Sequence, residues 1–549
     1  MSASDKKKLR KEQKAATLTE KQLKEQKEAK KLKNYTITFA VVMLLVVAIV
    51  IGVVLNNPVQ SAINRKTHAI TFGEHKLSTA DFSYYYVDAI SEYYDKVYSQ
   101  YGESFGNYWA MFLGFNVGEP LNDQIYDEEK GTTWAQRFVD TAIENAKQAY
   151  AIYDDALKNN HKLTEDEQRE LDLVEMSMSA VATYYGYSSA KDYLRATYGN
   201  GANMENYKNY STVSAYVRSY LTAKTDSFEY TNDEIRGYEK DKFLNYTKFD
   251  FCYYTINVMD YLGEGTKGED GKVTHTEQQK ADALAAAKKD ADSFLKAGIT
   301  DAEKFDKAVK ALSINKDNKN AACVQNKDVF YENLSYKEIQ EWLSNDDRKV
   351  NDFDYVPIIN KTGEGEDAKE EISGYLVILF QERDDCYTNL VSVRHMLSEF
   401  TYYQDKDGNK KVEDSNKVKV KKEAEDWLKE WKDGKATEES FAELANKYSD
   451  DGDGKSGGLY EGLFPGQTVD AFDKWCFDEN RKPGDTEVIE TEYGYHVMYF
   501  VETSEKTFRD VLIESDMIAE DLEEYIEKVS GEIKVEQINL KGLDWDFVV

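Results

Sequence analysis

The run "TEYGYHVMYF", residues 491–500, has the pattern of a strand and carries one histidine in its middle. Side chains alternate in direction along a strand, so His496 shares a face with Met498 and Phe500, and the residues between them point the other way. A histidine on such an apolar face is more often a packed core residue than a functional one. The chain has only six histidines, so other parts of the sequence must decide between these two interpretations.

A weak internal repeat provides a comparison for this strand. Without any gap, "EWLSNDDRKVND" at 341–352 matches "KWCFDENRKPGD" at 474–485. Each is followed by a similar strand, "GYLVILFQER" at 374–383 and "GYHVMYFVET" at 494–503. The repeat predicts two related folding units in the C-terminal half of the chain.

The two copies differ at their histidines. Leu376 occupies the place of His496, and an upstream match of "FDFCYYTINVM" with "LVSVRHMLSEF" puts Tyr254 in the place of His395. Joint loss of two residues that only pack would be a coincidence. We therefore interpret His395 and His496 as a functional pair.

Length and charge limit the class of protein. A chain of 549 residues is too long to form a single hydrophobic core. Since a typical domain has about 100 to 200 residues, this length predicts several folding units. With 41% apolar residues the chain can form real cores, whereas 31% charged residues and a net charge of -32 predict an acidic surface. This charge argues against nucleic acid as a partner.

The N-terminal region has the opposite charge and a long apolar run. Residues 1–34 hold 12 Lys and Arg against 5 Asp and Glu, and residues 35–55, "YTITFAVVMLLVVAIVIGVVL", contain no charge over 21 positions. Such a run is long enough for a helix to cross about 30 Å of hydrocarbon. The lysines directly before it predict a cytoplasmic N-terminus and an extracytoplasmic C-terminal part. The sequence after it, "VLNNPVQSAIN", offers no convincing cleavage site, which predicts an uncleaved single-pass anchor.

Between the anchor and the repeat, the sequence predicts mainly helices. Helix-start signals include capping boxes predicted at Thr133/Gln136, Thr164/Glu167 and Thr231/Glu234. This stretch is rich in tyrosine, which favours an aromatic core but also suits a groove for unfolded apolar segments. The sequence leaves these two alternatives open.

Residues 391–503, read as a unit, resemble the parvulin-type peptidyl-prolyl isomerases. The motifs are a histidine in the opening strand, F-x-x-L-A-x-x-Y-S-D before a Gly-Gly loop, G-Q-x-x-x-x-F at a helix start and T-x-x-G-Y-H in the last strand. Together with an anchor and a helical domain, they resemble extracytoplasmic foldases of the PrsA and SurA type. That resemblance implies a multidomain α+β chain with a transmembrane helix, a mostly α-helical chaperone domain, two parvulin-like α+β domains of which the first is degenerate, and a C-terminal helix.

The predicted domain boundaries follow from these patterns. They are a basic cytoplasmic segment (1–34), a transmembrane anchor (35–55), a helical chaperone domain (62–245) with 506–549 as its candidate completion, a degenerate parvulin-like domain (246–385) and a parvulin-type isomerase domain (386–505).

The resemblance also implies roles for single residues. His395 and His496 would form the central pair, Thr491 would hydrogen-bond into it, and Asp451 falls where other members carry cysteine or aspartate. The proline seat would be formed by Phe472, Tyr460 and Thr468. Many members have methionine where Thr468 stands, so proline packing is expected to be weaker by about 1 to 3 kcal/mol.

We expect no cofactor and no metal. Rotation about an X-Pro bond breaks no covalent bond, so the implied reaction needs no added group. The four cysteines form no C-x-x-C pair, which argues against a zinc site or a disulfide framework and leaves at most incidental pairing; they are Cys252, Cys323, Cys386 and Cys476.

The leading hypothesis is a membrane-anchored foldase that binds unfolded exported proteins and isomerises their X-Pro bonds. The alternative is a holdase whose parvulin-like domains only bind polypeptide. Client proteins and oligomeric state are left open by the sequence.

Overall fold

The computed structural model describes residues 59–240, 242–267, 273–318, 320–362, 369–406, 408–452, 456–537 and 539–543. The predicted cytoplasmic segment and transmembrane anchor lie outside these residues. Within the described ranges, no helix is both long and apolar enough to span a bilayer. The chain divides into two compact units, one ending at Phe228 and resuming at Glu520, the other running from Glu229 to Ala519.

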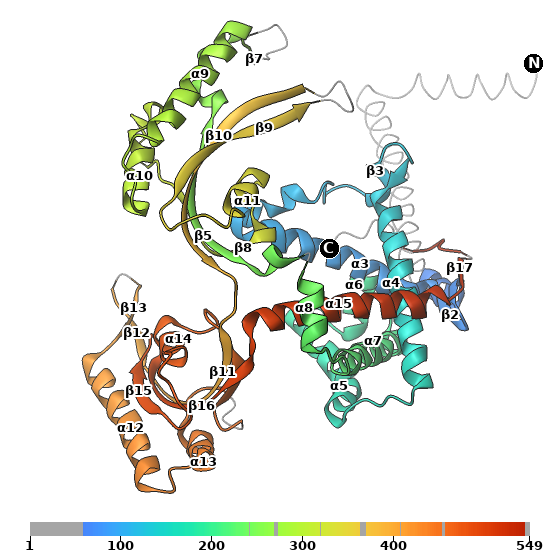
Figure 1. The fold of residues 1–549 in the computed structure, drawn as a ribbon. Coiled ribbons are helices and arrows are strands. Elements are labelled where there is room, and N and C mark those ends of the chain that lie inside the picture. The colour runs from blue at the N-terminus through green and yellow to red at the C-terminus, as the bar shows by residue number, and fades with distance from the viewer. Residues whose placement is uncertain are drawn as a thin grey trace, which may run out of the picture. The chain divides into compact units, whose positions relative to one another are not determined.

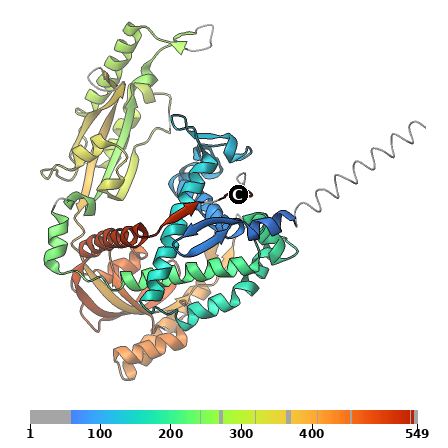
Figure 2. The ribbon, with the colours of Figure 1, turned by 90° about the vertical axis from the view of Figure 1, so that its right-hand side faces the viewer.

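The first unit is mainly helical and has one small sheet. Its helices are α3 (Thr79–Phe105), α4 (Trp134–Lys158), α5 (Glu165–Tyr184), α6 (Ala190–Tyr198) and α7 (Met204–Thr225). Its sheet has the order β17-β1-β2, formed by β1 (His68–Phe72), β2 (His75–Ser78) and β17 (Val535–Gln537). Figure 2 shows β17, in red, beside the blue N-terminal strands. The end of the chain thus completes a sheet that its N-terminal part begins.

The capping boxes predicted from the sequence form in the structure, with one exception. The predicted boxes Thr164/Glu167 and Thr231/Glu234 are confirmed, and the second starts α8 (Asn232–Glu239). Each pairs a threonine hydroxyl with a backbone N–H and a glutamate with the cap's own N–H.

The box predicted at Thr133 is only half formed. Its hydroxyl accepts from the Gln136 N–H at 3.2 Å, as expected. The Gln136 side chain instead donates to Asp140 Oδ1 at 2.7 Å. The Gln136 amide is thus held along the helix by an acidic residue one turn further on, because a hydrogen bond to a carboxylate is a strong one.

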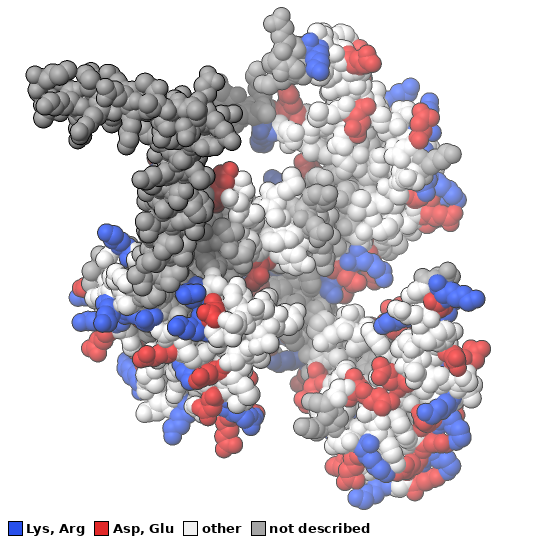
Figure 3. All heavy atoms as spheres, turned by 180° about the vertical axis from the view of Figure 1, so that it is seen from behind, with Lys and Arg blue, Asp and Glu red and all other residues white. Residues whose placement is uncertain are grey.

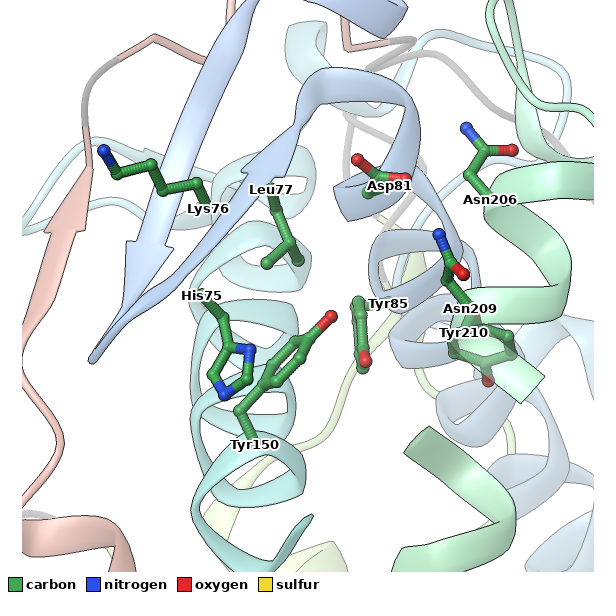
Figure 4. A pocket seen from close by; sticks show the side chains of 9 residues that line it. All are labelled: His75, Lys76, Leu77, Asp81, Tyr85, Tyr150, Asn206, Asn209 and Tyr210. Atoms are coloured by element: carbon green, nitrogen blue, oxygen red, sulfur yellow. The ribbon is translucent and has the colours of Figure 1, made fainter. Parts of the chain in front are cut away.

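The tyrosines of this unit are found both in the core and at the surface. Tyr84 and Tyr86 are 0% and 1% exposed and belong to the core, whereas Tyr184 is 84% exposed. Others, Tyr85 and Tyr150 among them, line a cavity of about 140 Å³ (Figure 4). Tyrosine content alone therefore does not separate core from surface.

The second unit contains two α+β domains with the same topology. In the first, the sheet order is β8-β5-β10-β9, from β5 (Lys248–Asn257), β8 (Val324–Phe330), β9 (Phe353–Thr362) and β10 (Lys369–Asp384). In the second it is β14-β11-β16-β15, from β11 (Asn389–Glu399), β14 (Leu459–Leu463), β15 (Thr486–Glu490) and β16 (Gly494–Thr507). Each pair of central strands is antiparallel.

Helices cover equivalent faces of these two sheets, as Figure 1 shows. In the first domain α9 (Glu277–Phe294) and α10 (Ala302–Ala311) pack on one face and α11 (Lys337–Leu343) on the other. In the second, α12 (Asp414–Asp433) and α13 (Glu438–Tyr448) oppose α14 (Asp470–Cys476). The last long helix, α15 (Phe508–Gly531), follows β16 and runs from the second unit into the first.

The solvent side of α12 illustrates the mixed surface charge. Acidic and basic side chains lie next to each other over the described part of the face in Figure 3. Along α12 they form i,i+4 ion pairs, such as Lys419 with Glu423. Exposed pairs of this kind add little stability, with a median of about 0 to 1 kcal/mol.

The predicted internal repeat is a structural one. Both central strand pairs have a register shift at the same place, which leaves Gln381 and Val501 as the extra residues. In both turns before the next strand, an arginine Nε donates to a tryptophan carbonyl, from Arg348 at 3.0 Å and from Arg481 at 3.1 Å. Bulges and turn contacts of this kind depend on backbone geometry, so their recurrence is stronger evidence than letter matches.

The strand register corrects one predicted equivalence. His395 pairs with Met498, and the corresponding pair in the first domain is Tyr253 with Ile378. The predicted counterpart, Tyr254, is wrong by one residue. Tyr254 points to the opposite face and donates to Asn315 Oδ1 at 3.1 Å, because a one-residue offset reverses the face of a strand.

Candidate active site

Two neighbouring strands bring the predicted histidines together. His395 lies on β11 and His496 on β16, and the register places them as diagonal neighbours on the face covered by α14. They are 2% and 5% exposed. The apolar alternation of each strand sets which face is buried, and the pairing sets which residues of that face meet.

The contacts around the two imidazoles guide the assignment of which ring nitrogens carry a proton. The two Nδ1 atoms are 3.1 Å apart, and His496 Nε2 is 2.9 Å from Thr491 Oγ1. Thr491 Oγ1 accepts from the Tyr493 N–H at 3.2 Å, and its own hydrogen can point to His496 Nε2. We assign the protons from this contact and from the Asp451 carboxylate beside His395 Nε2: His496 donates from Nδ1 to His395 Nδ1, and His395 carries its proton on Nε2.

The His395 Nε2–H faces an acidic loop. Nε2 lies 3.0 Å from Asp451 Oδ2, but its angle falls outside hydrogen-bond geometry and it has no other partner among the described residues. Asp451 also accepts from the Tyr460 hydroxyl at 2.8 Å. Interaction with His395, followed by that with Tyr460, lowers the pKa of Asp451 to about 2, against the opposing effect of its partial burial. The carboxyl is therefore ionised at neutral pH.

Burial keeps the His496 side chain uncharged, whereas Asp451 is ionised. It lowers the pKa of this imidazole to about 3; the charge of His395 adds to the effect and that of Asp451 opposes it. His496 is consequently neutral at physiological pH. A neutral, buried imidazole with both nitrogens engaged serves to orient its neighbours rather than to exchange protons.

The proposed proline seat lies against the histidines. The Phe472 ring packs edge-on at 5.3 Å from His395 and 5.5 Å from His496, and Tyr460 lies 4.7 Å from His395. Phe472 is only 3% exposed. The predicted set therefore converges at one place, with the exception of Thr468.

Thr468 stands just before α14, and no hydrogen bond or ring contact joins it to the histidines within the described residues. Its hydroxyl is buried without a partner in hydrogen-bond geometry in that same part of the chain, although it lies by the Asp473 carboxyl. An unpaired buried hydroxyl costs free energy, so the position is better suited to an apolar side chain.

A cavity of about 240 Å³ opens beside the histidine pair. His395, Asp451 and Tyr460 line it together with loop residues. Sequence analysis did not assign Ser449, which also lines the cavity. Its hydroxyl accepts from the N–H groups of Leu397 and Asp451 at 3.1 and 3.2 Å and so holds the acidic loop against β11; the serine of the Y-S-D motif was the available signal.

Fold and site together define a rotamase-class domain. Residues 395–502 match the family model of the PPIC-type PPIase domain, so this part of the chain is a parvulin-type domain. It is homologous to the corresponding domain of PrsA foldases. It is 34% identical over 111 residues to foldase protein PrsA 3 of Bacillus cereus and 31% identical over 147 residues to foldase protein PrsA 2 of Listeria monocytogenes.

These matches are partial. They cover 19% and 25% of this chain, and 38% and 47% of the two relatives. Solved structures with some likeness include PrsA from Bacillus subtilis, 21% identical over 29% of this chain and 55% of that chain, with a TM-score of 0.19. Another describes SurA-like chaperones of Campylobacter jejuni, 23% identical over 27% of this chain and 55% of that chain, with a TM-score of 0.17.

We predict that His496 remains neutral as the pH falls to about 3. The unfolded chain takes up this proton near pH 6.5, so the contribution of His496 to stability is complete above that pH and decreases between about 6.5 and about 3. Ring-nitrogen NMR shifts, assigned with a His496→Gln variant, measure the protonation state. An imidazolium signal for His496 at pH 5 would contradict the prediction.

Proposed function

We propose that the chain is a membrane-anchored extracytoplasmic foldase. Its residues 386–505 would isomerise X-Pro bonds, its helical domain at 62–245 would hold unfolded exported proteins, and residues 35–55 would anchor it in the cell membrane. The observation that carries this proposal is the His395–His496 pair beside ionised Asp451 at a cavity.

The chemistry required is selective binding of a twisted amide. The barrier to rotation about a peptide bond is about 18 to 20 kcal/mol, because rotation breaks the conjugation of nitrogen with the carbonyl. An enzyme lowers it by binding the twisted form more tightly than either planar form. Phe472 with Tyr460 would hold the proline ring, and Asp451 would supply a fixed negative charge near the twisting amide.

Within this proposal His395, His496 and Thr491 form the floor of the site. Their chain of hydrogen bonds starts at a backbone N–H and ends at the His395 Nε2–H, which faces Asp451. The polar groups are held in place before substrate binds, which favours electrostatic stabilisation without reorganisation.

The first α+β domain supports a different role. Leu376 and Tyr253 stand at the positions of the two histidines, and the equivalent face is filled by apolar side chains around Trp342. We infer that this domain contributes binding or structure rather than isomerisation.

A His496→Leu substitution reproduces what the first domain has at this position. We predict that kcat/KM in a protease-coupled proline-peptide assay falls at least about tenfold, or about 1.4 kcal/mol, because the His395 ring loses its orienting partner. The fold should persist, since Leu376 occupies the same place in a closely similar sheet. Tyr253→Phe in the first domain is the control, and unchanged kcat/KM in His496→Leu would refute the assignment.

Replacing Thr468 tests the proline seat. We predict that Thr468→Met raises kcat/KM by about tenfold, because a longer apolar side chain just before α14 would add contact for a proline ring held by Phe472. Thr486→Met is the matched control, because Thr486 pairs with Tyr499 on the other face of the same sheet. An equal change in both variants would exclude a specific role for Thr468.

The second candidate function, a holdase, is favoured by an exposed apolar face on α5. Leu173, Met176, Val181 and Tyr184 lie on one side of this helix and are 41%, 63%, 36% and 84% exposed. Exposed apolar patches of this kind mark sites for polypeptide or other apolar partners. This function is compatible with isomerase activity and independent of it.

We predict that Met176→Glu combined with Tyr184→Glu weakens suppression of aggregation of an unfolded client, because two charges then interrupt the apolar face. Light scattering at a fixed ratio of protein to client measures the effect, and His496→Leu should leave it unchanged. Val418→Glu is a matched control, since Val418 is 69% exposed but lies on α12 of the second α+β domain. Equal suppression by the double variant and the parent protein would rule out this face.

A further inference from the structure

Two cysteines of the first α+β domain lie side by side on one face of its sheet. Cys252 is on β5, and Cys323 directly precedes β8, an edge strand of that sheet. The register pairs Cys252 with Gln325. Since side chains two residues apart point to the same face, Cys323 is a diagonal neighbour of Cys252 on the face covered by α9 and α10.

One glutamine side chain joins the two sulfur atoms. Cys252 Sγ donates to Gln325 Oε1 at 2.9 Å, and Gln325 Nε2 donates to Cys323 Sγ at 3.1 Å. Gln381, the extra residue of the bulge, accepts from Cys252 Sγ at 3.3 Å. These contacts hold Cys252 as a donor and Cys323 as an acceptor.

The second domain has different residues on the same diagonal. Arg394 and Gly457 stand at the positions of Cys252 and Cys323, as the pairing of Arg394 with Leu459 establishes. Arg394 Nη1 donates to the Gly457 carbonyl at 3.1 Å, and a Cβ built on Gly457 would lie 2.9 Å from that nitrogen. Of the two domains, only the first places sulfur at both ends of this diagonal.

The two thiols differ in pKa and in exposure because their environments differ. Interaction with Cys252 and Gln325 lowers the pKa of Cys323 to about 7, although burial and the Asp306 carboxylate act in the other direction. Asp306, on α10, accepts from the Cys323 N–H at 3.2 Å and is itself paired with Lys310. The pKa of Cys252 is raised, first by Cys323 and then by burial. Cys323 is half-buried and Cys252 is fully buried.

We propose that Cys252 and Cys323 are a dithiol site that reacts with small-molecule disulfides and closes to an intramolecular disulfide. Cys323 is the attacking residue because it is the more accessible of the two, and Cys252 resolves the intermediate. Nothing in this proposal depends on isomerase activity.

The exchange is balanced in two steps. The Cys323 thiolate attacks one sulfur of the reagent RS–SR, whose S–S bond breaks as a Cys323–S–SR bond forms and one RS⁻ leaves. Cys252, after losing its proton, then attacks the Cys323 sulfur and displaces the second RS⁻. Two protein thiols are oxidised by two electrons, and the reagent is reduced to two RSH that carry the two protons.

Closure would tie an edge strand to the centre of the sheet. β8 pairs only with β5 in the sheet order of this domain, and the new bond would link its start to the middle of β5. The chain between the two cysteines contains α9 and α10, so the bond would close a long loop, which stabilises a fold mainly by constraining the unfolded chain. Oxidation of this site would therefore change the stability of the first domain and leave the histidine pair of the second domain unchanged.

The test uses the full chain, reduced and then equilibrated with oxidised glutathione. Titration of denatured samples should show free thiols falling from four to two per chain, and non-reducing peptide mapping should find a Cys252–Cys323 link that dithiothreitol reverses. Cys476→Ser should form the same link, because Cys476 lies on α14 of the other domain. Four remaining thiols, or a link that involves Cys386 or Cys476, would overturn the proposal.

A Cys252→Ser variant tests the order of attack. Without its resolving partner, Cys323 should retain glutathione as a mixed disulfide that the parent protein does not accumulate. Absence of this adduct on Cys323 under conditions that oxidise the parent would overturn its role as the attacking thiol. The parent measurement needs no variant, so it stands even where a substitution impairs folding.

Discussion

The antiparallel pairing of β11 with β16 is the constraint on which the isomerase-type domain depends. It places His395 opposite Met498 and leaves His496 two residues along the same face. A slip of one residue would turn one imidazole toward α12 and α13 and separate it from the other. The first domain uses the same kind of diagonal between β5 and β8 to bring Cys252 to Cys323. Diagonal positions on neighbouring antiparallel strands thus bring together a histidine pair in one domain and a cysteine pair in the other.

Burial then separates the charges of the candidate site. His496, enclosed by the sheet and α14, is held neutral, whereas Asp451 on a partly exposed loop is held ionised by His395 and Tyr460. The polar groups are oriented before any substrate arrives, because Thr491 fixes one end of the hydrogen-bond chain. This arrangement suits a reaction in which an amide twists and no covalent bond is broken.

Sequence reasoning succeeded where a signal was local and failed where it depended on pairing. The repeat around Trp342 and Trp475 was visible in letters, and capping boxes such as Thr164/Glu167 formed as expected. The match of Tyr254 to His395 failed because aligned letters carry no strand register. The Gln136 side chain donates to the Asp140 carboxylate and does not complete the predicted box, because side-chain geometry decides which partner it meets.

The sequence alone determined the alternation of the strands, the start of many helices and the residue types of the site, because these depend on neighbours a few positions away. It also indicated that the two histidines belong together, since both are missing from one copy. Only the tertiary structure decided that Cys252 and Cys323 are neighbours, that the Thr468 hydroxyl makes no hydrogen bond to the histidines within the described residues, and that His496 is neutral. These properties arise from strand register and burial, which bring together residues far apart in the chain.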